Sequence, residues 1–156
     1  MQISSLDLFI PAAEVEARVQ QLLLKITSVQ DASAECVDNG IITRGKTTLA
    51  ITVPFEALWR VSHGGAPSHL ATNEIVVELV WLKASVFGLG NDAMAGVLMN
   101  AVAKKLEDVH GVHVEGRAIR ADAVVVLKER LGVELRGVLR VLSFTREGVS
   151  VQVAAT

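Results

Sequence analysis

The side chains best suited to chemistry in this sequence are its four histidines, His63, His69, His110 and His113. The first two flank a Gly-Gly-Ala-Pro-Ser stretch where two imidazoles could chelate a metal ion, whereas Gly111 separates the other two. A zinc site normally needs three or four ligands at fixed spacing, and no Cys-x-x-Cys or His-Glu-x-x-His motif accompanies these histidines. We therefore interpret all four as solvated loop histidines and expect no metal and no cofactor.

Catalytic motifs are equally sparse. The sequence contains no Gly-x-Ser-x-Gly elbow, no Walker loop and no Gly-x-Gly-x-x-Gly fingerprint. Ser62 stands beside His63, but no local signature of a nucleophilic triad surrounds them. We therefore predict that the protein is not an enzyme. The competing hypothesis is a small enzyme that binds an apolar substrate, with His63 or Asp92 as the general base.

Charge and cysteine content argue against further classes of function and site. The formal net charge is −2, from 15 basic and 17 acidic residues, so the sequence offers no basic excess to neutralise phosphates and we expect no nucleic-acid partner. Cys36 is the single cysteine, which excludes an internal disulfide and a multi-cysteine metal site. We expect Cys36 to be a small buried hydrophobic side chain.

Apolar content is the strongest signal. Hydrophobic residues make up 51% of the chain, aromatic residues only 4%, and there is no tyrosine. Mean hydropathy is +0.43. An aliphatic surplus of this kind suits a hydrocarbon ligand, and it equally suits an aliphatic core or an apolar dimer interface. The longest apolar run, residues 93–103, is too short to span a membrane.

Hydrophobic periodicity predicts a single domain over residues 1–156. We expect a strand at 3–9, an amphipathic helix at 11–25, a strand at 32–37 and a tight turn at 38–40. A long strand over 41–55 bends at Gly45, and residues 56–62 either extend it or form a helical turn. The remaining elements are a loop at 62–69, a strand at 74–83, a helix beginning at Asn91 or Asp92 and ending before Gly111, a strand at 112–122, a short helix at 123–132 and a hairpin over 133–153.

Two of these strands carry apolar residues on both faces. In residues 74–83, alternation places Ile75, Val77, Leu79 and Trp81 together. In residues 133–144 it places Leu139 on one face, and Leu142 and Phe144 on the other. Strands in consecutive runs with few helices predict an α+β fold with an antiparallel sheet. A strongly curved antiparallel sheet wrapped around a long helix, with a second long helix, would accommodate the surplus and leave an apolar groove.

This order of elements resembles the tubular lipid-binding (TULIP) superfamily, in particular its small bacterial LmeA-type phospholipid-binding members. The stretches that carry the resemblance are LDLFIPAAEVEARVQQLL, VDNGIITRGKTTLAITVPF, AMAGVLMNAVAKKLEDVHGVHVEGRAIRAD and the closing hairpin. The resemblance implies a TULIP-like half-tube whose bent sheet holds acyl chains. The sequence lacks a lipobox cysteine and an evident leader, so we expect a cytoplasmic protein if the chain is complete and a periplasmic one if a leader has been removed.

The resemblance implies non-catalytic binding or carriage of a phospholipid or another acyl-chain ligand in an apolar groove. The implied lining residues are Leu49, Ile51, Val53, Phe55, Trp59, Val77, Leu79, Trp81, Leu98 and Leu142. Arg60, His63 or Arg117 would meet a headgroup at the mouth, and Trp59, beside a Gly-rich loop, could also contact a membrane surface. The alternative is a homodimeric interaction domain that buries the same apolar surface without a ligand.

Overall fold

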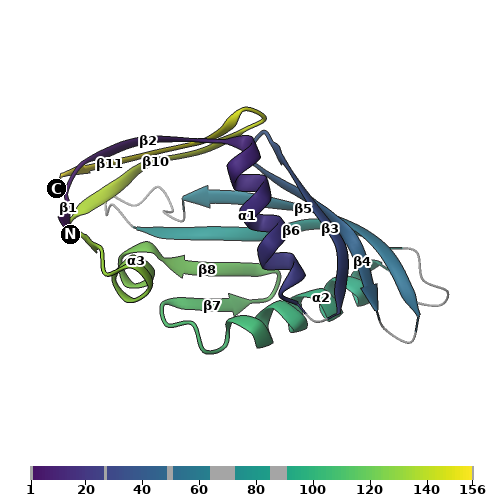
Figure 1. Cartoon of the computed structure of the whole chain (residues 1–156). Helices are drawn as coiled ribbons and strands as arrows, with labels where there is room; N and C mark the ends of the chain where they lie inside the picture. The colour runs from purple at the N-terminus through teal and green to yellow at the C-terminus, as the bar shows by residue number, and fades with distance from the viewer. Residues whose placement is uncertain (1, 27, 49–50, 64–72, 85–90, 156) are drawn as a thin grey trace.

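The computed structural model describes residues 2–26, 28–48, 51–63, 73–84 and 91–155. These residues form an α+β fold with three helices and mainly antiparallel sheets, which confirms the predicted class (Figure 1). No helix among the described residues is long and apolar enough to cross a membrane. Leu49 and His69 lie outside the described residues.

The largest sheet has six strands in the order β3-β4-β5-β6-β8-β7, and every neighbouring pair is antiparallel. Its strands are β3 (Val29–Val37), β4 (Gly40–Thr48), β5 (Thr52–His63), β6 (Glu74–Ala84), β7 (Val112–Glu115) and β8 (Ala118–Asp122). The turn between β3 and β4 was predicted correctly: Asn39 adopts a φ of 65°, which asparagine tolerates better than most residues.

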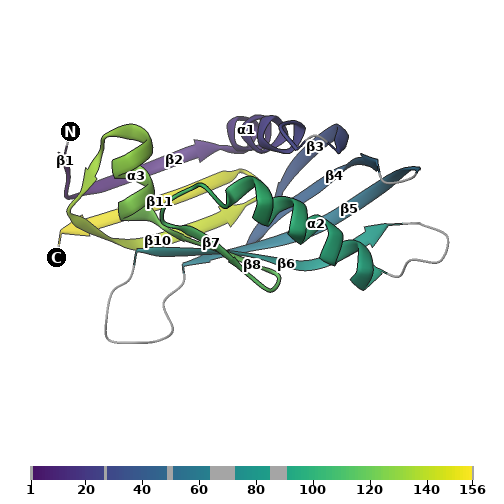
Figure 2. The same ribbon diagram turned by 90° about the horizontal axis from the view of Figure 1, so that it is seen from below.

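A second, three-stranded sheet has the order β10-β11-β2. Its strands are β2 (Leu6–Pro11), β10 (Gly137–Thr145) and β11 (Gly148–Ala155), and a short parallel pair joins β1 (Gln2–Ile3) to β9 (Glu134–Leu135). β10 is the strand that contacts the large sheet, at β3, β4 and β5. Figure 2 shows the three-stranded sheet extending from that junction, with β2 at its far edge.

The helices are α1 (Ala12–Leu24), α2 (Asn91–Leu106) and α3 (Ala123–Leu131), close to the predicted bounds. α3 begins where the Asp122 carboxylate accepts hydrogen bonds from the backbone N–H groups of Val124 and Val125, and it ends at Gly132, whose φ is 65°. α1 and α2 pack on one face of the six-stranded sheet, which we call its inner face (Figures 1 and 2).

The inner face carries the main core. The side chains buried there come from both α1 and α2 and from β3, β5 and β6: Leu23, Val29, Ala32, Phe55, Ala57, Trp59, Leu79, Leu82, Met94, Ala95 and Met99. Residues of odd number in β4 and β5 point to this face, and those of even number point to the opposite, outer face.

The prediction of one long strand over 41–55 was wrong, because this stretch is the β4–β5 hairpin. Thr48 pairs with Thr52, so three residues separate the two strands. An odd number of intervening residues keeps odd-numbered side chains on the same face after the chain reverses. The alternation therefore runs through the turn without a break, and periodicity alone does not reveal it.

The predicted strand at 112–122 is likewise a hairpin, β7–β8. Glu115 pairs with Ala118, which leaves Gly116 and Arg117 as the turn. Gly116 has a φ of 59°, in the left-handed region that glycine enters at little cost. The central glycine thus reverses the chain instead of bending one strand.

A β-bulge explains why residues 74–83 look apolar on both faces. Trp59 pairs with Leu79 but Leu58 pairs with Trp81, so Val80 is an extra residue in β6. Beyond the bulge the alternation changes phase, and Leu82 follows Leu79 on the inner face. Trp81 was predicted to share a face with Leu79, and this is wrong: Trp81 lies on the outer face, where the Lys83 ammonium is 4.9 Å from its ring centroid.

Candidate functional site

One face of the three-stranded sheet is entirely apolar. A bulge at Arg140 shifts the phase of β10, so Leu139, Leu142 and Phe144 lie on one side although their numbers differ in parity. The prediction that placed Leu139 and Leu142 on opposite faces is therefore wrong. Directly paired residues of the three strands form the apolar face in three rows: Leu139, Val153, Leu6; Leu142, Val151, Leu8; Phe144, Val149, Ile10.

This apolar face is only partly covered. Leu139, Val149 and Val153 are buried, whereas Leu8 is 41% exposed and the other five side chains are half-buried. The opposite side of β2 carries Phe9, which is 53% exposed. Leu8 and Phe9 are thus adjacent in one strand but point to opposite faces of the sheet. Substitutions at these two positions therefore form a matched pair.

A second apolar surface belongs to the inner face of the six-stranded sheet, in the part nearest β8. Register places Val77 beside Ile119 and Ile75 beside Ala121, and all four side chains are half-buried. We call these four residues the inner wall. Ile75 packs against the cluster of Leu135, Leu139 and Val153, as do Val124 and Leu127 of α3, whereas Val77 and Ile119 also pack against the edge of the main core.

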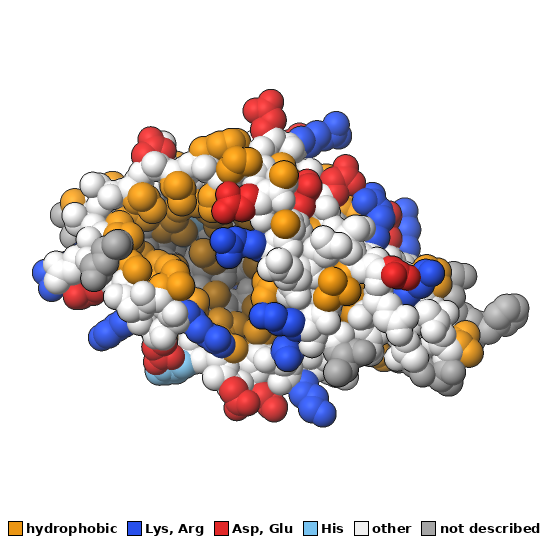
Figure 3. Space-filling model, viewed as in Figure 1, with side chains coloured by type: hydrophobic (Ala, Val, Ile, Leu, Met, Phe, Trp, Pro, Cys, Tyr) orange, Lys and Arg blue, Asp and Glu red, His pale blue; other side chains and the backbone are white. Residues whose placement is uncertain are grey.

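Figure 3 shows that the molecular surface is hollowed beside α1, between the three-stranded sheet and the region of β8 and α3. Hydrophobic side chains gather around this hollow, and acidic and basic side chains lie along parts of its rim. The apolar face lies on the three-stranded sheet, and the inner wall lies on β6 and β8. Both surfaces therefore belong to the region around this hollow.

Five of the ten sequence-predicted lining residues belong instead to the packed core. Val53, Phe55, Trp59 and Leu79 are buried, and Leu98 packs against that core from α2. The Trp59 indole N–H donates a 2.9 Å hydrogen bond to the Thr43 hydroxyl, and both side chains are buried. A buried, hydrogen-bonded Trp59 does not form the exposed aromatic rim that the sequence suggested.

Only two predicted residues lie on the surfaces described above, Val77 in the inner wall and Leu142 in the apolar face. Ile51 is 58% exposed at the end of the β4–β5 hairpin, and Trp81 lies on the outer face. Sequence reasoning missed the other members of both surfaces. The alternation of Leu6 and Leu8 in the predicted first strand, continued by Ile10 just beyond it, was the available signal.

The three candidate headgroup residues are separated by the fold. His63 lies on the inner face, paired with Ile75, whereas Arg60 lies on the outer face, paired with Glu78. Arg117 occupies the β7–β8 turn and donates a 2.7 Å hydrogen bond to the Asp92 carboxylate. Of the three, His63 alone shares a face with the inner wall.

The two alternative general bases of the enzyme hypothesis lie far apart in the fold. Asp92 follows Asn91, whose side chain accepts a hydrogen bond from the Ala84 N–H at the end of β6, whereas His63 pairs with Ile75 near the start of β6. That length of strand spans about 30 Å. Ser62 and His63 are neighbours in β5 and point to opposite faces. Within the described ranges, no three His, Cys, Asp or Glu residues are grouped to hold a metal ion.

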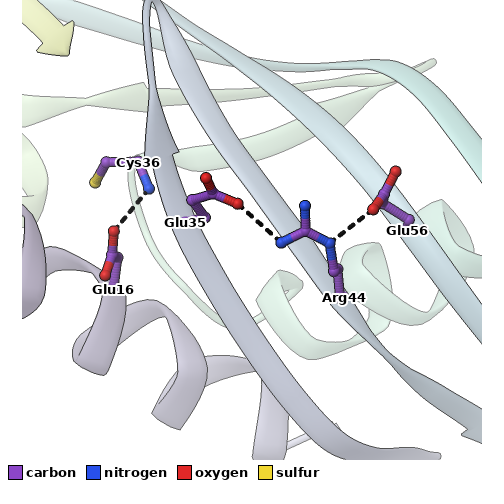
Figure 4. Close-up of polar contacts among 5 residues, drawn as sticks. All are labelled: Glu16, Glu35, Cys36, Arg44 and Glu56. Carbon is purple, nitrogen blue, oxygen red and sulfur yellow. Dashed lines mark hydrogen bonds and ion pairs between the residues drawn. The ribbon is translucent and has the colours of Figure 1, made fainter. Parts of the chain in front are cut away.

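Polar contacts elsewhere hold the sheet together (Figure 4). The Glu16 carboxylate of α1 accepts a 3.0 Å hydrogen bond from the Cys36 N–H on the edge strand β3, and Arg44 bridges Glu35 and Glu56 across three strands. Cys36 is 2% exposed, as predicted for a buried hydrophobic side chain. Its burial, and then the nearby Glu16 carboxylate, raise the pKa of the Cys36 thiol.

Comparisons of this chain with protein-family models, with characterised proteins and with solved structures found no match. The two apolar surfaces and the side chains beside them are therefore the features from which a function can be inferred.

Proposed function

We propose that this protein binds or carries a lipid or another acyl-chain ligand, without catalysis, between the apolar face and the inner wall. The observation that carries this proposal is the nine-residue apolar face, which contains no polar side chain and leaves Leu8 41% exposed. A contiguous apolar surface that is left partly uncovered is characteristic of binding sites. The hollow of Figure 3 lies beside it.

The chemistry of the two surfaces selects the ligand class. Their side chains are aliphatic, with Phe144 as the single aromatic member. Aliphatic walls offer neither stacking platforms nor directional hydrogen bonds, so they favour hydrocarbon over sugars or bases. Each methylene moved from water onto such walls contributes about 0.8 kcal/mol, and affinity should rise with chain length.

The TULIP-like half-tube is part of the same proposal. In this arrangement the three-stranded sheet, joined to the large sheet along β10, would be one flank of the half-tube, and α1 would be the helix that the sheets enclose. Two contacts support a fixed junction: the Asn39 N–H donates to the Phe144 carbonyl oxygen, and the Asn73 side chain bonds both the Gly137 carbonyl and the Leu139 N–H.

A homodimer is the second candidate, because β2 is an edge strand that carries the exposed side chains Leu8 and Phe9. Edge strands pair readily with a second chain. In that case the exposed side chains would be covered by another copy instead of by a ligand.

The Leu8 and Phe9 pair distinguishes these functions. Leu8→Asp places a carboxylate on the apolar face, so we expect the affinity for a fluorescent long-chain fatty acid to fall by about tenfold or more. Phe9→Asp places the same charge on the opposite face and should change that affinity by less than about twofold. Circular dichroism verifies that both variants are folded.

Two results would count against this proposal. Equal losses of affinity in Leu8→Asp and Phe9→Asp would show that the apolar face is not the binding surface. A wild-type protein that has a doubled mass in native mass spectrometry, holds no small molecule and becomes monomeric in either variant would establish the homodimer instead.

A further inference from the structure

His63 is the last residue of β5, and its position places a polar group beside the inner wall. Side chains alternate along β5, so His63 shares the inner face with Trp59 and Val61. Register pairs Val61 with Val77 and His63 with Ile75, both members of the inner wall. Cβ atoms of directly paired residues lie about 5 Å apart, so the imidazole and the Ile75 side chain are neighbours.

No other basic side chain among the described residues of the six-stranded sheet shares this face. The remaining basic residues on its strands alternate to the outer face, as the register shows: Arg44, Lys46, Arg60, Lys83, His113 and Arg120. The His63 imidazole, next to an aliphatic surface, can supply a polar contact that the surface itself lacks.

The His63 imidazole is suited to binding an anionic ligand group. A neutral imidazole donates one N–H and a protonated one donates two, and both forms bind an anionic oxygen. His63 also interacts with other groups of the protein, and an anionic ligand group would join those contacts. A chain that lies on Ile75 and Val77 would present its terminal group to this position.

We infer that the ligand is an acidic amphiphile, a single acyl chain or lipid that ends in a carboxylate or phosphate, and that His63 binds its anionic group. This inference rests on the proposed function and adds the ligand's charge and the residue that recognises it. Hydrophobic contact with the two apolar surfaces holds the chain, and the imidazole discriminates between an acid and a neutral molecule of equal length.

The test compares a long-chain fatty acid, the alcohol of the same chain length and a monoacylglycerol phosphate of that chain by isothermal titration calorimetry. We expect the wild type to bind the two acids about tenfold more tightly than the alcohol, the size expected for one charge-assisted hydrogen bond. The relative affinities of the two acids tell carboxylate from phosphate. His63→Leu should bring the acids to the affinity of the alcohol and leave the alcohol unchanged, whereas the milder His63→Gln keeps an N–H donor and should retain part of the preference. Arg60→Gln, on the outer face of the same strand, is the matched control and should retain the preference.

The possible results distinguish a failure of the inferred role of His63 from a failure of the proposed ligand binding. If the acids and the alcohol bind the wild type equally, or if His63→Leu weakens all three alike, the inference is overturned while ligand binding stands. If none of the three binds, the proposed function itself fails.

Discussion

The hydrogen bond between Trp59 and Thr43 gives the sharpest test of the core. Thr43 is 2% exposed and Trp59 is 7% exposed, and the indole N–H lies 2.9 Å from the hydroxyl oxygen. Thr43→Val replaces the hydroxyl with a methyl group of similar size and leaves the backbone unchanged. The indole N–H then has no acceptor at that position, in a place that water does not reach.

The expected cost follows from that geometry. A buried donor left without a partner costs about 1–3 kcal/mol, and the added methyl group recovers only part of that loss. We therefore expect Thr43→Val to lower the free energy of unfolding by about 1.5 kcal/mol. Thr43→Ser keeps the hydroxyl and loses a methyl group, so its cost should be about 1 kcal/mol through packing alone.

Urea denaturation followed by tryptophan fluorescence measures these differences. Trp81 is the only other tryptophan, so it still reports on unfolding when Trp59 is replaced by phenylalanine. A double-mutant cycle of Thr43→Val with Trp59→Phe isolates the pair, and we expect a coupling energy of about 1 kcal/mol or more. Thr43→Val should leave fatty-acid affinity unchanged, because Trp59 belongs to the core and not to the ligand site.

A coupling energy near zero would refute this reasoning, since it would mean that the hydrogen bond does not form or that water solvates the indole. A large loss of ligand affinity in Thr43→Val at full stability would also contradict it, because it would return Trp59 to the binding surface.

Two further predictions concern the junction of the sheets and the buried thiol. Asn73→Asp keeps the acceptor for the Leu139 N–H but loses the donor to the Gly137 carbonyl, so we expect urea unfolding to show a loss of about 1–2 kcal/mol, and an unchanged midpoint would disprove the role of this amide. The raised pKa of Cys36 means that the folded protein holds the thiol proton more tightly than the unfolded chain. This contribution to stability is complete below the unfolded thiol pKa, about 8.5, and is lost as the pH rises above it. Wild-type stability should therefore decline more steeply than that of Cys36→Ala between about pH 8 and pH 10, as measured by urea titrations at each pH; parallel curves would contradict the assignment.

Local sequence signals were sufficient to predict the elements whose ends are marked by capping or turn residues. Asp122 and Gly132 delimit α3, and Asn39-Gly40 marks the β3–β4 turn, because capping and positive φ angles depend on residues close in sequence. The α+β class followed from the order of these elements.

The faces of the strands could not be predicted, because they depend on register. The bulges at Val80 and Arg140 change which side chains share a face, and no local pattern in either strand marks them. Trp81 was therefore assigned to the wrong face. The β4–β5 turn is hidden for a related reason, since its length preserves the alternation across it.

The candidate site was only partly predictable for the same reason. Val77 and Leu142 were predicted and lie on the two apolar surfaces, but Leu8 and Ile119 were not, because the site joins strands from both ends of the chain. Burial also separates residues of similar chemistry: Val53 and Leu79 are aliphatic like the lining residues, but each is only 1% exposed. Composition reveals the aliphatic surplus but does not show which part of it remains uncovered.

The most direct test of ligand binding is mass spectrometry of the purified protein under native conditions, followed by organic extraction and lipid analysis. Binding between the apolar face and the inner wall predicts an acyl-chain molecule that accompanies the wild type in a fixed ratio and is depleted in Leu8→Asp but not in Phe9→Asp. A wild-type protein that yields no lipid after gentle purification, and takes up none when offered acyl-chain ligands, would contradict it.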